Sequence, residues 1–98
     1  MRESWFQRRL IKELKEKYPD SIIKKVEPPP QGIPDVWIFH TNGKYAALEC
    51  KKSAKEHHQP NQDYYVDKIN KMAFARFIFP ENKEEVLNEL QRALESGR

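Results

Sequence analysis

Two strand-like segments joined by a tight turn impose the strongest constraint on the fold of this 98-residue chain. Residues 35–40 (DVWIFH) and 44–52 (KYAALECKK) are rich in β-branched, aromatic and alternating residues, and Thr41-Asn42-Gly43 lies between them. Asn-Gly is the strongest short-range signal for a β-hairpin, because both residues tolerate positive φ. The sequence therefore predicts an antiparallel hairpin in which position 40 pairs with 45, 38 with 47 and 36 with 49.

Periodic apolar residues predict a helix on each side of this hairpin. Residues 3–18 carry Phe6, Leu10, Leu14 and Tyr18 at intervals of four, and Pro19 ends the pattern. A second helix is expected from about residue 61 to 72, with Tyr65, Ile69 and Met72 on one face. Asn82, with Glu85 three residues later, predicts the N-cap of a last helix that ends at Gly97.

Two further strands complete the predicted sheet, one at 21–26 (SIIKKV) and one at 74–79 (FARFIF). The segment 44–79 reads as strand, crossover helix and strand, which implies a parallel pair of strands. The predicted fold is α/β (α+β), with a mixed four-stranded sheet flanked by helices and a C-terminal helix, in one domain spanning residues 1–98.

Composition points to a small protein with a polyanionic partner. The net charge is +3, and the one cysteine excludes an internal disulfide framework. No apolar run is long enough to span a membrane, and no leader segment is recognisable, so the expected location is the cytoplasm. Five basic or titratable residues in and after the second hairpin strand are the candidate contacts to a polyanion: Lys44, Lys52, Lys55, His57 and His58.

Three charged residues stand inside the otherwise apolar hairpin. Alternation puts Glu49 and Lys51 on one face of their strand and Cys50 on the other, in packing. Asp35 opens the partner strand and lies beside Glu49 if the strands twist or bulge by about one residue. Two neighbouring carboxylates repel unless a hard divalent cation such as Mg²⁺ or Mn²⁺ binds between them. Two acids, a lysine and such a metal are suited to hydrolysing a phosphodiester.

Other interpretations of these residues remain open. Asp35, Glu49 and Lys51 would form a solvent-facing ion pair if the hairpin lay at the edge of the sheet. Glu3 would then only complement the helix macrodipole, and Gln62 would be an ordinary first-turn polar residue. His57 and His58 lack the spacing of a zinc site, and no phosphate-binding glycine loop is present.

The motifs resemble those of the PD-(D/E)XK nuclease superfamily, with Pro34-Asp35 and Glu49-Cys50-Lys51 as the signature. More narrowly, the chain is similar to small stand-alone bacteriophage members of the VRR-NUC family. Glu3 matches the helical acid of that family, and Pro60-Asn61-Gln62 matches its Pro-x-Gln helix start. The resemblance implies a restriction-endonuclease-like αβββαβ core.

The resemblance also implies roles for individual residues. Asp35, Glu49 and the Cys50 backbone carbonyl would bind Mg²⁺, for which Mn²⁺ would substitute. Lys51 would position or activate the attacking water. Glu3 would assist the metal site, and Gln62 would support it.

The function implied by the resemblance is a metal-dependent DNA endonuclease. A homodimer of so small a domain would carry two sites and suit branched DNA, as in Holliday-junction resolvases. The alternatives are a nicking, restriction-type or single-strand nuclease in phage DNA processing, located in the host cytoplasm, and a non-catalytic DNA-binding module. Neither a nucleotide cofactor nor a membrane partner is expected.

Overall fold

A computed structural model describes residues 2–27 and 30–95. Its elements, in chain order, are α1 (Glu3–Lys17), β1 (Ile22–Lys25), β2 (Val36–Phe39), β3 (Tyr45–Cys50), α2 (Gln62–Met72), β4 (Phe74–Ile78) and α3 (Lys83–Glu95). The predicted order of helices and strands is confirmed. Gly97, predicted to end the last helix, lies outside the described residues.

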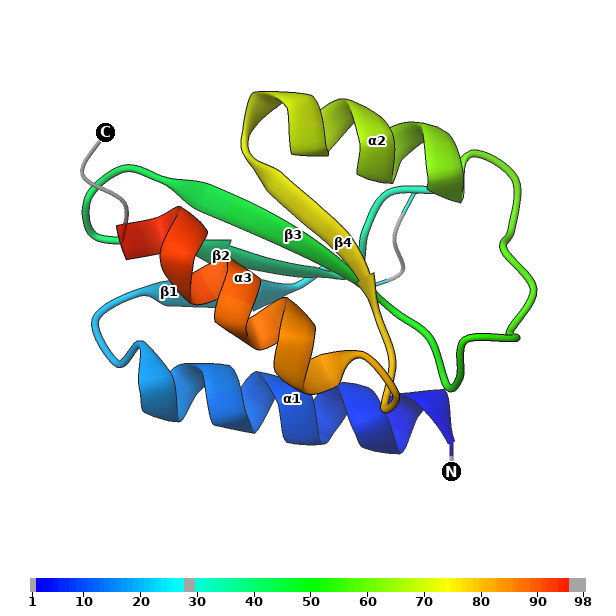
Figure 1. Cartoon of the computed structure of the whole chain (residues 1–98), viewed down its shortest axis with the longest axis horizontal. Coiled ribbons are helices and arrows are strands. Elements are labelled where there is room, and N and C mark those ends of the chain that lie inside the picture. Colours follow the sequence, from blue (N-terminus) through cyan, green and yellow to red (C-terminus); the bar gives the residue numbers. More distant parts are fainter. Residues whose placement is uncertain (1, 28–29, 96–98) are drawn as a thin grey trace.

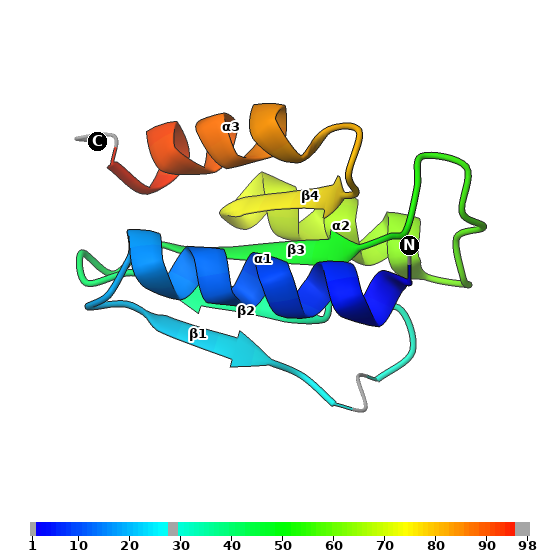
Figure 2. The same cartoon turned by 90° about the horizontal axis from the view of Figure 1, so that it is seen from below.

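The sheet is mixed, as predicted. Its strand order is β1-β2-β3-β4, so β2 and β3 are interior strands. The β1–β2 and β2–β3 pairs are antiparallel, and β3 pairs with β4 in parallel across the α2 crossover. Figure 1 shows α2 on one face of the sheet and α1 with α3 on the other, and Figure 2 shows α1 crossing in front of the strands. The fold is therefore a four-stranded mixed sheet between two helical layers.

The hairpin register differs from the prediction by one residue. Trp37 is opposite Ala47, and Phe39 is opposite Tyr45. The loop has three residues, because the His40 N–H donates to the Lys44 carbonyl (2.8 Å) and Gly43 turns the chain with φ +90°. Continued by one position, this register places Asp35 across from Glu49 without the bulge that the sequence analysis required.

The two faces of the sheet have separate cores. On the α1 and α3 face, Leu10 and Leu14 pack with Ile38 and Leu48. The face alternation predicted for β3 is confirmed, with Cys50 fully buried in this core.

On the other face, Val66 and Ile69 of α2 pack against Ala47 and Ala75. The prediction that Met72 lies on this helix face is wrong, because it is the last residue of α2 and is 61% exposed. Val66 packs in its place, three residues before Ile69.

Asn82 directly precedes α3, as the predicted N-cap requires, but its side chain bonds to the end of β4 and the turn that follows. Its carbonyl accepts the Val86 N–H (2.9 Å), the first bond of the helix. Its Oδ1 accepts the Phe79 N–H (2.9 Å), and its Nδ2 donates to the Phe77 carbonyl (3.0 Å). The Asn82 amide therefore holds the turn between β4 and α3.

Within residues 2–27 and 30–95, no helix combines the length and the apolarity that crossing a membrane requires.

Candidate metal centre

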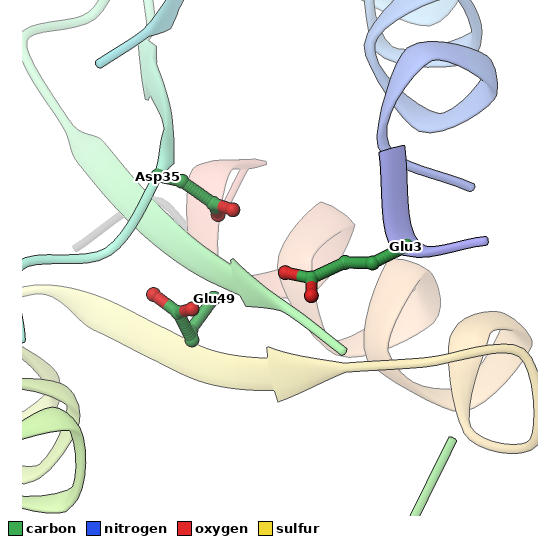
Figure 3. A group of neighbouring side chains, drawn as sticks. All are labelled: Glu3, Asp35 and Glu49. Carbon is green, nitrogen blue, oxygen red and sulfur yellow. The ribbon is translucent and has the colours of Figure 1, made fainter. Parts of the chain in front are cut away.

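Three carboxylates from three different elements meet at one end of the sheet. Glu3 is the first residue of α1, Asp35 directly precedes β2, and Glu49 lies in β3. One oxygen from each carboxylate lies within 4.8 Å of the others. Figure 3 shows Glu3 reaching from the first turn of α1 toward Asp35 and Glu49. The structure thus brings together the three acids that the sequence singled out.

Asp35 is held in place by hydrogen bonds to both carboxylate oxygens. Oδ1 accepts the Cys50 N–H (3.1 Å) from β3, and Oδ2 accepts Nε2 of Gln7 (2.7 Å) from α1. The side chain is only 8% exposed, and burial raises the pKa of Asp35 while these hydrogen bonds oppose the rise. Gln7 and β3 therefore fix the orientation of this carboxylate before any ligand binds.

Glu49 has one satisfied and one unsatisfied oxygen. Its Oε2 accepts Nε2 of Gln62 (3.0 Å), whereas Oε1 is buried and has no hydrogen-bond partner among the described residues. Burial raises the pKa of Glu49 to about 8, the charge of Asp35 adds to the rise, and Lys51 opposes it. An unpartnered buried carboxylate oxygen is costly, so this atom points to a ligand.

Glu3 has a neighbouring acid that the sequence analysis missed. Burial raises the pKa of Glu3 to about 7, with further contributions from a hydrogen bond to Glu56 and from the charges of Glu56 and Asp35. Glu56 lies in the loop between β3 and α2, where no periodicity marks a functional residue. The one available signal was that Glu56 is the only acidic residue between Lys51 and Asn61.

Lys51 directly follows β3 and is buried beside the acids. Its Nζ donates to Oε1 of Gln62 (2.6 Å) and to the His57 carbonyl (3.1 Å), and it lies 3.9 Å from Oε2 of Glu56. Since the Gln62 amide also donates to Glu49, it links the lysine to the acid. Gln62 is thus more than an ordinary first-turn polar residue.

The interpretation of a solvent-facing ion pair at a sheet edge is wrong. β3 is an interior strand, and the exposed fractions are 8% for Asp35, 4% for Glu49 and 2% for Lys51. Buried charges need partners, and here amides and backbone groups supply them, except at Oε1 of Glu49.

A close backbone contact joins the segment before Asp35 to the start of α2. Gly32 has φ +90°, and a Cβ added to it would lie 2.5 Å from the Cβ of Asn61. Asn61 itself adopts φ 73° immediately before α2. Only glycine fits at position 32, and its packing on Asn61 holds the segment that leads to Asp35 against the residue that precedes α2.

An open cavity of about 760 Å³ gives access to the acids. Arg2 and Ser4 line it at the start of α1, Lys25 lines it at the end of β1, and Gln31 lines it from the segment between β1 and β2. The cavity is large enough for a substrate phosphate group.

The basic residues predicted to contact a polyanion do not all lie near this cavity. Lys52, Lys55 and His57 are exposed on the loop beside it. His58 stacks on Phe77 (ring centroids 4.1 Å apart), and its Nδ1 lies 2.8 Å from Oδ1 of Asp63.

Lys44 is at the opposite end of β3, five residues or about 17 Å from Glu49 along the strand. Its Nζ lies 3.5 Å from the Ala93 carbonyl of α3. The hairpin therefore separates Lys44 from the candidate centre.

The donor set fits a hard divalent cation. The group that could hold a metal, among the described residues, consists of the carboxylates of Glu3, Asp35 and Glu49 and contains neither histidine nor cysteine. Oxygen donors suit Mg²⁺ or Mn²⁺ and not the zinc that thiolate and imidazole prefer. Burial raises the pKa of Cys50, so its sulfur stays a protonated thiol, and its backbone carbonyl as a metal ligand stays a prediction.

The chain matches no protein-family model, no curated protein and no solved structure.

Proposed function

We propose that this chain is a metal-dependent DNA endonuclease similar to the VRR-NUC branch of the PD-(D/E)XK nucleases. One observation carries the proposal: the unpartnered Oε1 of Glu49 is buried within a group of carboxylates whose oxygens lie within 4.8 Å of one another. Asp35 and Glu49 would hold Mg²⁺, or Mn²⁺ in its place, with Glu3 as a further ligand. Burial, and after it the charge of Asp35, raises the pKa of Glu49, and a bound cation would relieve the repulsion between these acids.

The chemistry follows from the groups around the cavity. A Mg²⁺ ion held by Asp35 and Glu49, with Glu3 as a further ligand, would supply Lewis-acid polarisation of the phosphoryl oxygen and would lower the pKa of the attacking water. The Lys51 ammonium, held by Gln62 and the His57 carbonyl, neutralises negative charge that develops on the phosphate. As the resemblance to the PD-(D/E)XK nucleases implies, water would attack phosphorus in line and the bond to the 3′ oxygen would break, which would leave a 5′-phosphate and a 3′-hydroxyl.

Cleavage of labelled DNA tests this function. A four-way junction, a flap, a single strand and a linear duplex are incubated with Mg²⁺, Mn²⁺ or EDTA. The native chain is compared with Lys51→Ala and with Lys68→Ala, an exposed lysine on α2. We expect metal-dependent cleavage by the native chain and Lys68→Ala, and a loss of about 10²-fold or more for Lys51→Ala.

The same panel distinguishes the alternatives. Paired cuts across the junction support a resolvase-like enzyme, and preferential cutting of another substrate supports a nicking, restriction-type or single-strand nuclease. DNA binding without cleavage in either metal would favour the non-catalytic module and contradict the proposal.

We also propose that the enzyme is a homodimer. α2 packs on β3 and β4 and does not extend over β1 and β2. On those two strands, Ile22 (66% exposed) and Phe39 (44% exposed) lie opposite each other. The Phe39 ring stacks with Trp37 and Tyr45, which makes a flat apolar surface that a second copy would cover.

Light scattering tests the dimer. The native chain should have twice the monomer mass, and Phe39→Glu should be monomeric. Tyr64→Glu, at another exposed aromatic residue (59% exposed) on α2, should remain dimeric. A monomeric native chain at micromolar concentration would refute the dimer.

A further inference from the structure

Cationic side chains and a tryptophan form an exposed strip along the N-terminal half of α1. We define the α1 strip as Arg2, Trp5, Arg8, Arg9 and Lys12, all of which are exposed. Positions 5, 8, 9 and 12 have the i, i+3, i+4, i+7 spacing of one helix face. The buried face of α1 instead carries Phe6, Leu10 and Leu14, so Trp5 is not needed for the core.

Trp5 presents its indole beside the guanidinium group of Arg9. The side chain is 42% exposed, and the guanidinium carbon of Arg9 lies 4.8 Å from the ring centroid. A separate hollow beside the ring is bounded by Arg2, Ser4, Trp5 and Arg8. An aromatic ring flanked by arginines is suited to a planar base with phosphates on both sides of it.

The hollow adjoins the cavity of the candidate metal centre. Arg2 and Ser4 line both the hollow beside Trp5 and the cavity that contains Glu3, Asp35 and Glu49. A strand bound along the α1 strip would therefore reach the cavity past these two residues.

The charge distribution favours a polyanion on this helix over α3. The solvent side of α3 carries Glu84, Glu85 and Glu95, which repel phosphates. On α1, the acidic Glu13 is neutralised by Lys83 (2.7 Å). The exposed Glu16 lies one turn after Lys12, so the cationic side chains outnumber the acids along this face.

Stacking on Trp5 favours unpaired over duplex DNA. Bases in a duplex are already stacked on one another and paired, whereas an unpaired base can lie on an exposed indole. We propose that the α1 strip binds an unpaired DNA segment leading to the scissile phosphate, with one base stacked on Trp5 and phosphates held by Arg2, Arg8 and Lys12. This inference rests on the proposed nuclease function, because it names the substrate segment beside that site.

Binding without cleavage tests the inference directly. Fluorescence anisotropy in EDTA compares a labelled duplex with the same duplex carrying a single-stranded extension. The native chain should bind the extended DNA more tightly. Trp5→Ala should remove this preference with a loss of about fivefold or more, and Trp5→Phe should retain part of it.

Salt dependence tests the phosphate contacts. For the extended DNA, Arg8→Gln should reduce the slope of log affinity against log salt by about 0.7, which is the value for one phosphate contact on a single strand. Lys68→Gln removes the same charge from α2, on the other face of the sheet, and should leave both the slope and the affinity unchanged.

Stacking has its own spectroscopic signature. A 2-aminopurine base in the extension should be quenched when the native chain binds, and Trp5→Ala should abolish the quenching at saturating protein. Equal affinity and equal quenching for native, Trp5→Ala and Arg8→Gln would overturn the inference, even if the chain cleaves DNA in Mg²⁺. Binding through the strip without any cleavage would support the inference and count against the proposed nuclease.

Discussion

At the scale of single residues, the centre holds acids that the fold alone does not stabilise. Glu49 is almost fully buried, one of its oxygens has no partner among the described residues, and its pKa is raised to about 8. The pKa of Asp35 is also raised by burial, and the charge of Asp35 repels that of Glu49. Groups that lower stability without a ligand are typical of functional sites.

Glu49→Gln should therefore stabilise the metal-free protein. The amide has no charge to bury, its oxygen can still accept Nε2 of Gln62, and its NH₂ can donate to the neighbouring carboxylates. We expect the free energy of unfolding in EDTA at pH 8 to rise by about 1 kcal/mol or more. For a domain of this size, that is an increase in Tm of about 4–8 °C.

Thermal unfolding monitored by circular dichroism measures this change, with the exposed Glu84→Gln as the control. A Glu49→Gln variant that is less stable than the native chain in EDTA would show that the carboxylate is satisfied within the fold.

The sequence was informative for residues on strands and less so for loop residues. Asp35, Glu49 and Lys51 could be placed together, because strand alternation and a hairpin turn relate distant positions by simple rules. Glu56 could not, since its position depends on bonds specific to its loop, including that from the Lys52 N–H to its Oε1 (2.5 Å).

At the scale of elements, the contact between Gly32 and Asn61 aligns two segments of the centre. One leads to Asp35, and the other begins α2 with Gln62. The sequence around Gly32 and Asn61 indicates only local turns and does not relate the two residues to each other, so their contact could not be predicted. The hairpin register was likewise wrong by one residue, because Thr41-Asn42-Gly43 is compatible with loops of different length.

Gly32→Ala should destabilise the protein more than Gly43→Ala. Both glycines have φ +90°, which costs a residue with a side chain about 1–2 kcal/mol. Only at Gly32 would the new Cβ overlap other atoms, those of Asn61, and this overlap should lower the free energy of unfolding by a further ~1–3 kcal/mol. A new Cβ at Gly43 meets nothing within 4 Å among the described residues.

Urea unfolding of the two variants measures the difference. Equal losses of unfolding free energy for Gly32→Ala and Gly43→Ala would mean that the contact with Asn61 does not hold the two segments together.

At the scale of the whole molecule, stability should depend on pH in a way set by the acids. The folded-state pKa is raised from 4.5 to about 7 for Glu3 and to about 8 for Glu49. Between pH 4.5 and 8 the folded chain therefore binds more protons than the unfolded chain, and the free energy of unfolding falls as pH rises.

A melting series in EDTA tests this dependence. Tm should fall from pH 5 to pH 8, and added Mg²⁺ should raise Tm more at pH 8 than at pH 5, since cation binding requires deprotonated carboxylates. Glu49→Gln should flatten the dependence in EDTA. A native Tm that rises over this range without metal would contradict the assigned shifts.

The overall architecture was the most predictable level. Apolar periodicity and the strand–helix–strand segment determined the order of elements and the mixed sheet. The surface was harder to interpret, because basic residues close in sequence, such as Lys44 and Lys52, lie at opposite ends of β3. The α1 strip, formed by helical spacing, was not recognised as a unit.

Binding of Mn²⁺ measured by isothermal titration calorimetry at pH 8 tests the metal centre most directly. Titrations in two buffers of different ionisation enthalpy also count the protons released. The native chain should bind Mn²⁺ saturably and release protons, and Asp35→Asn should weaken binding at least about tenfold. Glu84→Gln should bind like the native chain. No saturable binding by the native chain, or equal affinity for native and Asp35→Asn, would contradict a metal held between these carboxylates.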